Sequence, residues 1–183
     1  KISIVEVKGY CYGWHFYIAG DADIVVASEE SLFGHASFRY VGWAARMWQW
    51  TLMMGLRKFQ EMVFTGRPFT AKQMYDCNFV NSVVPRDQLE AETMKYALAC
   101  ARNRPTDTIV MQKTFFEIFK QQQGEYMGSV LSGWLEGDGV EQNPTEAARL
   151  FARAANAGHP QAAAGEFGKW TRAGGKPFPP LVR

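Results

Sequence analysis

Apolar and polar residues alternate over Lys1–Val7 ("KISIVEV"), and this period of two predicts a strand over Ile2–Val7. A loop is expected over Gly9–Gly13, a short helix over His15–Ala22 and a buried strand over Asp23–Ala27. Parallel strands can be joined only through a covering crossover segment. The order strand, loop, helix, strand therefore predicts an α/β fold.

Helical spacing of apolar residues dominates the middle of the chain. It runs from Trp43 to Thr65 with an interruption at Gly55, and Thr70 can cap a short helix after it. The remaining expected elements are a strand over Val80–Val84, a helix from Pro85 to about Arg102 and a helix from Pro105 to about Lys120.

The composition shifts to alanine beyond Asn143, where "NPTEAARLFARAANAGHPQAAAGEFGKW" resembles one copy of a Sel1-type helical repeat. A single repeat cannot bury its own apolar face, because such repeats normally stack in groups of about three. We therefore predict a core over 1–120 and a helical C-terminal arm with an extended tail over 121–183. The arm is expected to pack on the core or on a neighbouring subunit.

Charge and cysteine content narrow the function classes. The 183 residues carry a formal net charge of only +2 with both signs interspersed, so no nucleic-acid partner is expected. No segment approaches the ~20 apolar residues of a membrane span. The three cysteines and three histidines lack the spacing of a disulfide framework or a metal site. We expect a cytoplasmic protein with reduced thiols and no membrane or metal partner.

The stretch "KGYCYGWHFYIAGDADIVVA" is the main candidate for chemistry. A glycine before a helix start lets backbone N–H groups approach a ligand, and Gly13 has that place. The bulky residues Trp14, His15 and Tyr17 follow it. The stretch therefore predicts an anion-binding turn whose side-chain chemistry has been changed.

Two longer segments, "GYCYGWHFYIAGDADIVVASEESLFG" and "MGLRKFQEMVFTGRPFTAKQMYDCNFVNSVVPRDQLEAE", resemble the crotonase (enoyl-CoA hydratase/isomerase) family. The resemblance covers roughly Ile2 to Lys120. It implies a spiral of strand, strand and helix turns, a homotrimer or homohexamer, and an acyl-CoA thioester as substrate. Coenzyme A would be part of the substrate, and no separate cofactor is implied.

The resemblance also implies an oxyanion hole that stabilises a thioester enolate. One backbone N–H donor aligns with Trp14, beside Gly13. The second donor belongs to a segment upstream of Lys1, and we expect that an N-terminal portion is missing from this sequence. The two glutamates that hydratases of the family use align with Tyr17 and Ser37, so ordinary hydration is not expected.

Other side chains are weaker candidates. His35 can act as an acid or base near neutral pH, or it can be a hydrogen-bonded loop residue. His15 is a candidate for substrate binding, and Arg39 a candidate partner for a substrate carboxylate or a CoA phosphate. The tryptophans Trp43, Trp48 and Trp50 fit a core or a subunit interface, and a flat acyl pocket is the alternative.

Two function classes stay open. The first is an active enzyme that makes or breaks a carbon–carbon bond or isomerises its substrate. "FGHASFRYVG" is similar to the "FGQxGPxVG" of naphthoate-forming synthases and ring-opening ketoacyl-CoA hydrolases, which also lack the second glutamate. The second class is a protein that binds acyl-CoA, or serves as an assembly subunit, without catalysis.

Overall fold

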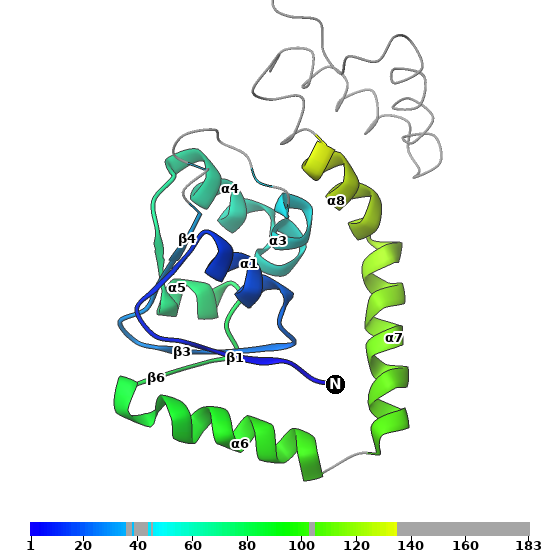
Figure 1. The fold of residues 1–183 in the computed structure, drawn as a ribbon. Helices are drawn as coiled ribbons and strands as arrows, with labels where there is room; N and C mark the ends of the chain where they lie inside the picture. Colours follow the sequence, from blue (N-terminus) through cyan, green and yellow to red (C-terminus); the bar gives the residue numbers. More distant parts are fainter. Residues whose placement is uncertain (36–37, 39–43, 45, 103–104, 135–183) are drawn as a thin grey trace, which may run out of the picture. The chain divides into compact units, whose positions relative to one another are not determined.

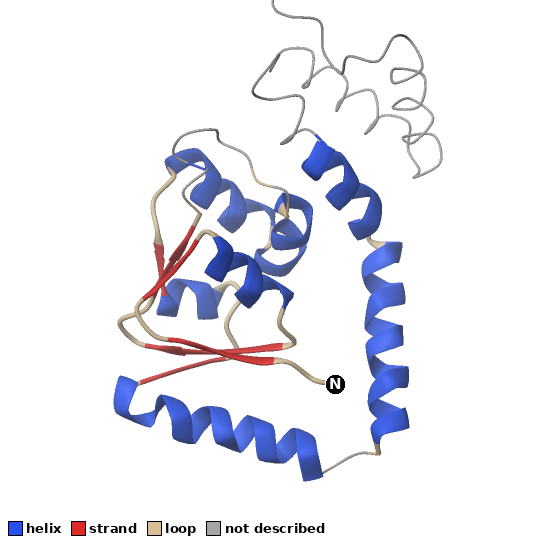
Figure 2. Ribbon diagram, in the orientation of Figure 1, coloured by secondary structure: helices blue, strands red, loops and turns tan. Residues whose placement is uncertain are grey.

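Two three-stranded sheets organise the chain (Figure 2). The computed structural model describes residues 1–35, 38, 44, 46–102 and 105–134. The first sheet is wholly parallel and consists, in spatial order, of β1 (Ile4–Val7), β3 (Ile24–Ser28) and β6 (Ser82–Val84). The second is mixed and consists of β2 (Tyr10–Tyr12), β4 (Leu32–Gly34) and β5 (Phe69–Thr70), with β5 antiparallel to β4.

The chain passes through both sheets three times and adds one strand to each sheet on every passage. The first passage gives β1 and β2, the second β3 and β4, and the third β5 and β6. Ile4 of β1 pairs with Ile24 of β3, and Tyr10 of β2 pairs with Leu32 of β4, both in parallel register. Helix α1 (Trp14–Asp21) connects the first passage to the second and packs against β1 and β2. The α/β fold expected from the sequence is therefore confirmed.

Three short strands differ from the sequence prediction. The predicted loop over Gly9–Gly13 is wrong at its centre, because Tyr10–Tyr12 forms β2 and pairs with β4. β4 and β5 were not predicted either. The alternation of exposed Tyr10 and Tyr12 with buried Cys11 is typical of a half-buried strand, but it lasts for only three residues.

The remaining helices largely follow the predicted pattern. Gly55 separates the two helices of the middle segment, as expected, and a 3₁₀ turn over Arg86–Gln88 precedes the helix predicted to begin at Pro85. The helices are α3 (Met47–Met54), α4 (Leu56–Thr65), α5 (Ala71–Asp76), α6 (Leu89–Arg102), α7 (Thr106–Gln122) and α8 (Glu125–Trp134). α6 packs on β1 and β3, on the side of the first sheet away from α1 (Figure 1).

An aromatic core lies beneath α1. The rings of Phe16 and Phe79 stack with centroids 5.0 Å apart, and Trp50 meets Phe16 edge-on at 4.7 Å. All three are essentially inaccessible to solvent. A Cβ atom on Gly20 would lie 2.6 Å from Nε1 of Trp50, so only glycine allows the indole to approach the helix this closely.

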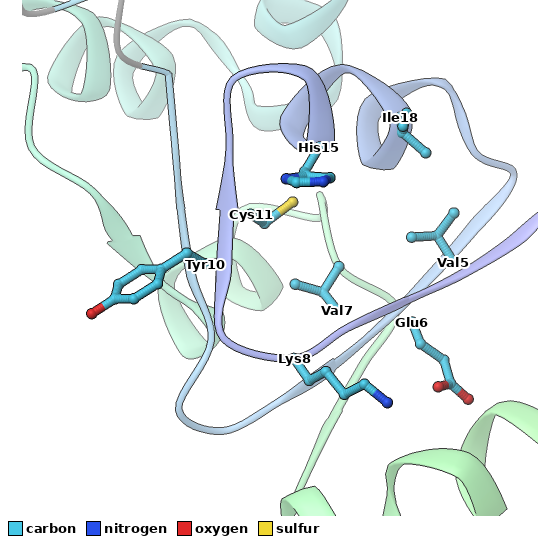
Figure 3. Close-up of a pocket in the computed structure, with 8 residues that line it drawn as sticks. All are labelled: Val5, Glu6, Val7, Lys8, Tyr10, Cys11, His15 and Ile18. Carbon is cyan, nitrogen blue, oxygen red and sulfur yellow. The ribbon is translucent and has the colours of Figure 1, made fainter.

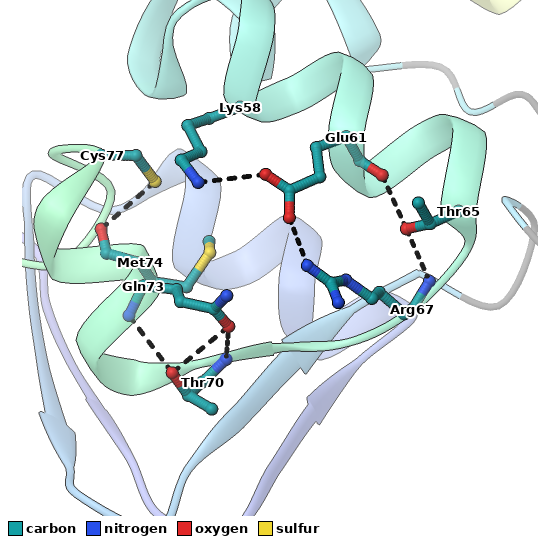
Figure 4. Close-up of polar contacts among 8 residues, drawn as sticks. All are labelled: Lys58, Glu61, Thr65, Arg67, Thr70, Gln73, Met74 and Cys77. Atoms are coloured by element: carbon teal, nitrogen blue, oxygen red, sulfur yellow. Dashed lines mark hydrogen bonds and ion pairs between the residues drawn. The ribbon is translucent and has the colours of Figure 1, made fainter.

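A polar network fixes the turn between α4 and α5 (Figure 4). Glu61 accepts hydrogen bonds from Lys58, at 3.0 Å, and from Arg67, and these contacts hold the pKa of its carboxyl group below the usual value. Thr70 and Gln73 form the capping box of α5, with reciprocal side-chain and backbone bonds. The predicted role of Thr70 as an N-cap is therefore confirmed.

The chain divides into two contact units. One consists of Lys1–Gly42 and Gln49–Phe119, and the other of Trp43–Trp48 and Lys120–Arg183. In the second unit, the Trp48 indole lies against α8 and donates a hydrogen bond to the carbonyl of Gln123. The buried carboxylate of Glu125 pairs with Arg46 at 3.6 Å. Residues 135–183, which include most of the predicted arm and its tail, lie outside the described residues.

Candidate active site

The start of α1 presents free backbone donors. Gly13 adopts φ 58° and ψ −122°, and its carbonyl accepts the N–H groups of Phe16 and Tyr17 at 3.0 and 3.2 Å. The N–H groups of Trp14 and His15 have no acceptor within the part of the chain that the structure describes. They stand at the positive end of the helix dipole, where an oxyanion is stabilised.

Trp14 and Tyr17 lie one helical turn apart and contact each other. Their ring centroids are 5.2 Å apart with an interplanar angle of 37°. The Trp14 side chain is 80% exposed, whereas Tyr17 is half-buried. The Tyr17 phenol ring is thus held against the Trp14 side chain, one turn along the helix from the free N–H groups.

His35 reaches the same place from the end of β4. A hydrogen bond of 3.3 Å from the N–H of Gly13 to the carbonyl of Gly34 brings this strand end to the start of α1. The imidazole meets the Tyr17 ring edge-on, with centroids 5.1 Å apart. Burial lowers the pKa of His35, so its ring is neutral and able to accept a proton near pH 7.

Two buried aromatic residues back this group. Trp50 contacts Tyr17 and His35, with ring centroids at 5.0 and 5.8 Å, and Phe38 contacts His35 at 5.5 Å. The sequence predicted a core or subunit-interface position for Trp50, with an acyl pocket as the alternative, but it did not single out Phe38. Its position within "FGHASFRYVG", three residues after His35, was the available signal.

His15 lies apart from this group. Its side chain lines a hollow of about 260 Å³ between β1, β2 and α1 (Figure 3). Val5, Val7 and Ile18 supply apolar walls, and burial raises the pKa of the neighbouring Cys11 thiol to about 12. This Cys11 is therefore a protonated, unreactive thiol at neutral pH.

Ser37 and Arg39, the other predicted site residues, lie outside the described residues, as does Trp43. Among the residues that are described, no cluster of three His, Cys, Asp or Glu side chains could hold a metal ion. The same part of the chain contains no helix long and apolar enough to cross a membrane.

Comparison with named proteins identifies relatives. The chain is 35% identical over 107 residues to a mevalonyl-coenzyme A hydratase of Aspergillus fumigatus, covering 57% of this chain and 40% of the relative. It is 30% identical over 113 residues to a mevalonyl-coenzyme A hydratase of Beauveria bassiana, with 60% and 40% covered. The chain thus spans about 40% of the length of these relatives.

Solved structures share the fold. An enoyl-CoA hydratase from Mycobacterium smegmatis matches 95% of this chain and 59% of its own, at a TM-score of 0.71 and 23% identity. A probable enoyl-CoA hydratase from Mycobacterium thermoresistibile is 32% identical at a TM-score of 0.65, covering 70% of this chain and 52% of its own.

The sequence profile of the family described as "Enoyl-CoA hydratase/isomerase" matches residues 1–129. This match spans more than half of the chain and includes both sheets and the helix start at Gly13. The chain therefore belongs to the enoyl-CoA hydratase/isomerase, or crotonase, family.

Proposed function

We propose that this protein is an acyl-CoA enzyme that stabilises a thioester enolate with the backbone N–H of Trp14. The observation that carries the proposal is the meeting of three groups at one helix start. They are the free N–H of Trp14, the phenol-bearing ring of Tyr17 and the neutral imidazole of His35. Family membership supports binding of an acyl-CoA thioester, and a helix-start donor suits a developing oxyanion.

In the proposed mechanism, His35 removes a proton from the carbon next to the thioester carbonyl. The electron pair moves onto the carbonyl oxygen, which accepts a hydrogen bond from the Trp14 N–H. With a β,γ-unsaturated thioester the product is a dienolate. Its γ-carbon takes the proton of the Tyr17 hydroxyl, which gives the α,β-unsaturated isomer, and the proton held by His35 then returns to the Tyr17 phenolate. Alternatively, the enolate carbon attacks a second carbonyl and forms a carbon–carbon bond, and the new alkoxide takes the Tyr17 proton, which His35 replaces. Reversal of the attack breaks such a bond.

The other predicted residues have supporting roles in this proposal. Gly13, at φ 58° and ψ −122°, sets the backbone geometry that precedes the Trp14 N–H. His15, Ser37 and Arg39 remain candidates for substrate contacts, with Arg39 as a partner for a carboxylate or a CoA phosphate.

A second candidate is the hydration or dehydration of a branched acyl-CoA. Two relatives, 35% and 30% identical, are named mevalonyl-coenzyme A hydratases, and this supports such a reaction. A third candidate is acyl-CoA binding without turnover, since the 80% exposed Trp14 indole stands directly at the donor.

Replacing Tyr17 with Phe tests the enzyme proposal. We expect the Tyr17→Phe variant to lose ~10²-fold or more in kcat on a substrate found by screening CoA thioesters, because the proton donor is removed. Binding of the thioester, measured by calorimetry, should be nearly unchanged. The matched control is Tyr75→Phe on α5, which removes an exposed hydroxyl elsewhere. A full rate in Tyr17→Phe would return Tyr17 to the role of a packing residue.

The pH dependence of kcat/KM tests His35. Burial lowers its pKa, so the imidazole becomes protonated and unable to accept a proton only when the pH falls below the usual value of 6.5. We expect kcat/KM to rise with pH along a limb whose midpoint lies below 6.5. This limb should disappear in His35→Asn and persist in His15→Asn. An unchanged limb in His35→Asn would exclude His35 as the base.

The proposal includes a homotrimer or homohexamer. Helix α7 exposes apolar side chains over most of its circumference, outside the half-buried face of Ile109 and Lys113, and such a helix is normally covered by another surface. Their exposed fractions are 55–71% at Val110, Met111, Phe115, Phe116, Ile118 and Phe119. Light scattering at micromolar concentration should give the mass of three or six chains, and the mass of one chain would reject this part of the proposal.

A cytoplasmic location is also part of the proposal. All three cysteines, Cys11, Cys77 and Cys100, are free thiols, and the first two are buried. Unpaired cysteines support a reducing compartment.

A further inference from the structure

Three rings form a continuous aromatic surface beside the proposed oxyanion donor. We call Trp14, Tyr17 and His35 the aromatic ladder, because each ring contacts the next at a centroid distance of 5.2 or 5.1 Å. Trp50 and Phe38 back the ladder from within the core and are 0% and 6% exposed. The outer ring of the ladder is the least covered, since Trp14 is 80% exposed.

The ladder offers flat faces and few polar atoms. Its polar groups are one phenol hydroxyl, one indole N–H and one imidazole that burial keeps neutral. The sequence from Ser31 to Gln60, which includes His35 and the backing residues, contains no Asp or Glu. A hydroxylated acyl group would find few hydrogen-bond partners among these rings. A planar π-system would instead gain ring contacts in offset or edge-on geometry.

We propose that the acyl group selected by this site carries a planar aromatic ring beyond an enolisable CH₂ group, as in an arylacetyl thioester, and that Trp14 and Tyr17 determine this selectivity. The inference rests on the proposed function, because the thioester carbonyl must lie at the Trp14 N–H for the acyl group to meet the ladder. Trp14 supplies a face that remains open to a ligand, and Tyr17 holds the indole in place from the side.

The test compares phenylacetyl-CoA with cyclohexylacetyl-CoA, which share a carbon skeleton but differ in planarity and π-electrons. Calorimetry on the full chain gives both dissociation constants, with free CoA as a reference. Phenylacetyl-CoA should bind about fivefold to tenfold more tightly, as expected for one or two aromatic contacts. The more apolar cyclohexane ring would be favoured by hydrophobic transfer alone, so area burial cannot produce this preference.

Two variants assign the preference to the ladder. Trp14→Leu keeps an apolar side chain and removes the π face, and it should bind the two esters equally. Phe64→Leu is the matched control, because Phe64 on α4 is an equally exposed aromatic residue at 79%. It should keep the wild-type preference. Thermal unfolding checks that both variants fold. We expect that they do, because the Trp14 and Phe64 side chains are exposed at the surface.

Each outcome decides between the claims. Equal binding of the two esters by the wild-type protein overturns the inference and leaves the proposed function standing. A preference that persists in Trp14→Leu overturns the assignment to the ladder. If neither ester binds more tightly than free CoA, the proposed function fails and the inference fails with it.

Discussion

The purified protein is expected to hydrate crotonyl-CoA about 10⁴-fold more slowly than a family member that carries both hydratase glutamates. Each missing acid–base group typically costs 10²- to 10⁴-fold in rate. The resemblance aligns Tyr17 with the first glutamate, and a phenol with a reference pKa near 10 cannot replace a carboxylate base at pH 7. It aligns Ser37 with the second, and no Asp or Glu occurs between Ser31 and Gln60 to compensate.

The assay follows the loss of enoyl absorbance, with a family hydratase run in parallel as the positive control. Calorimetric binding of crotonyl-CoA separates a slow chemical step from a failure to bind. Hydration at a rate comparable to the control enzyme would show that the roles inferred for Tyr17 and Ser37 are wrong.

Substitution of Gly13 should have the next largest effect. Its φ of 58° and ψ of −122° are strained for any residue with a Cβ atom, although no neighbouring atom lies within 4 Å of the place such an atom would take. Gly13→Ala should therefore shift the backbone dihedral angles of the turn, and the Trp14 N–H should then no longer point where the oxyanion is proposed to bind. Loss of one oxyanion donor typically costs 10²- to 10³-fold in kcat, and we expect a loss of that order.

Gly9→Ala is the matched control for this experiment. Gly9 also has a positive φ, at 87°, and also has no atom within 4 Å of an added Cβ. It lies between β1 and β2, away from the helix start, so Gly9→Ala should lower stability by a similar amount, about 1–2 kcal/mol, with kcat retained. Equal losses of kcat in the two variants would mean that backbone strain in general, and not the donor at Trp14, limits the rate.

The sequence predicted those features that depend on neighbouring residues. The N-cap at Thr70 and the helix break at Gly55 each involve only a few consecutive positions. β2 and β4 have three residues each, and their strand conformation depends on the pairing of Tyr10 with Leu32. Three residues are too few to predict a strand without knowledge of the partner segment, so the sequence predicted a loop over Gly9–Gly13 where β2 forms.

The same distinction applies to the site. Trp14 and Tyr17 are three residues apart in the sequence, a spacing that puts two side chains on one helical face, and their rings contact each other. The approach of His35 depends on the hydrogen bond between Gly13 and Gly34, which the β2–β4 pairing brings together. Such a contact between distant parts of the sequence becomes visible only after the strands are paired.

The pairing of the parallel sheet has a consequence for the order in which the protein folds. Ile4 meets Ile24 across 20 residues, whereas Val26 meets Ser82 across 56. Closing the longer loop costs about 1 kcal/mol more chain entropy than closing the shorter one. The first two passages of the chain can thus pair while β6 is still emerging from the ribosome, and β6 then joins a two-stranded template that already exists.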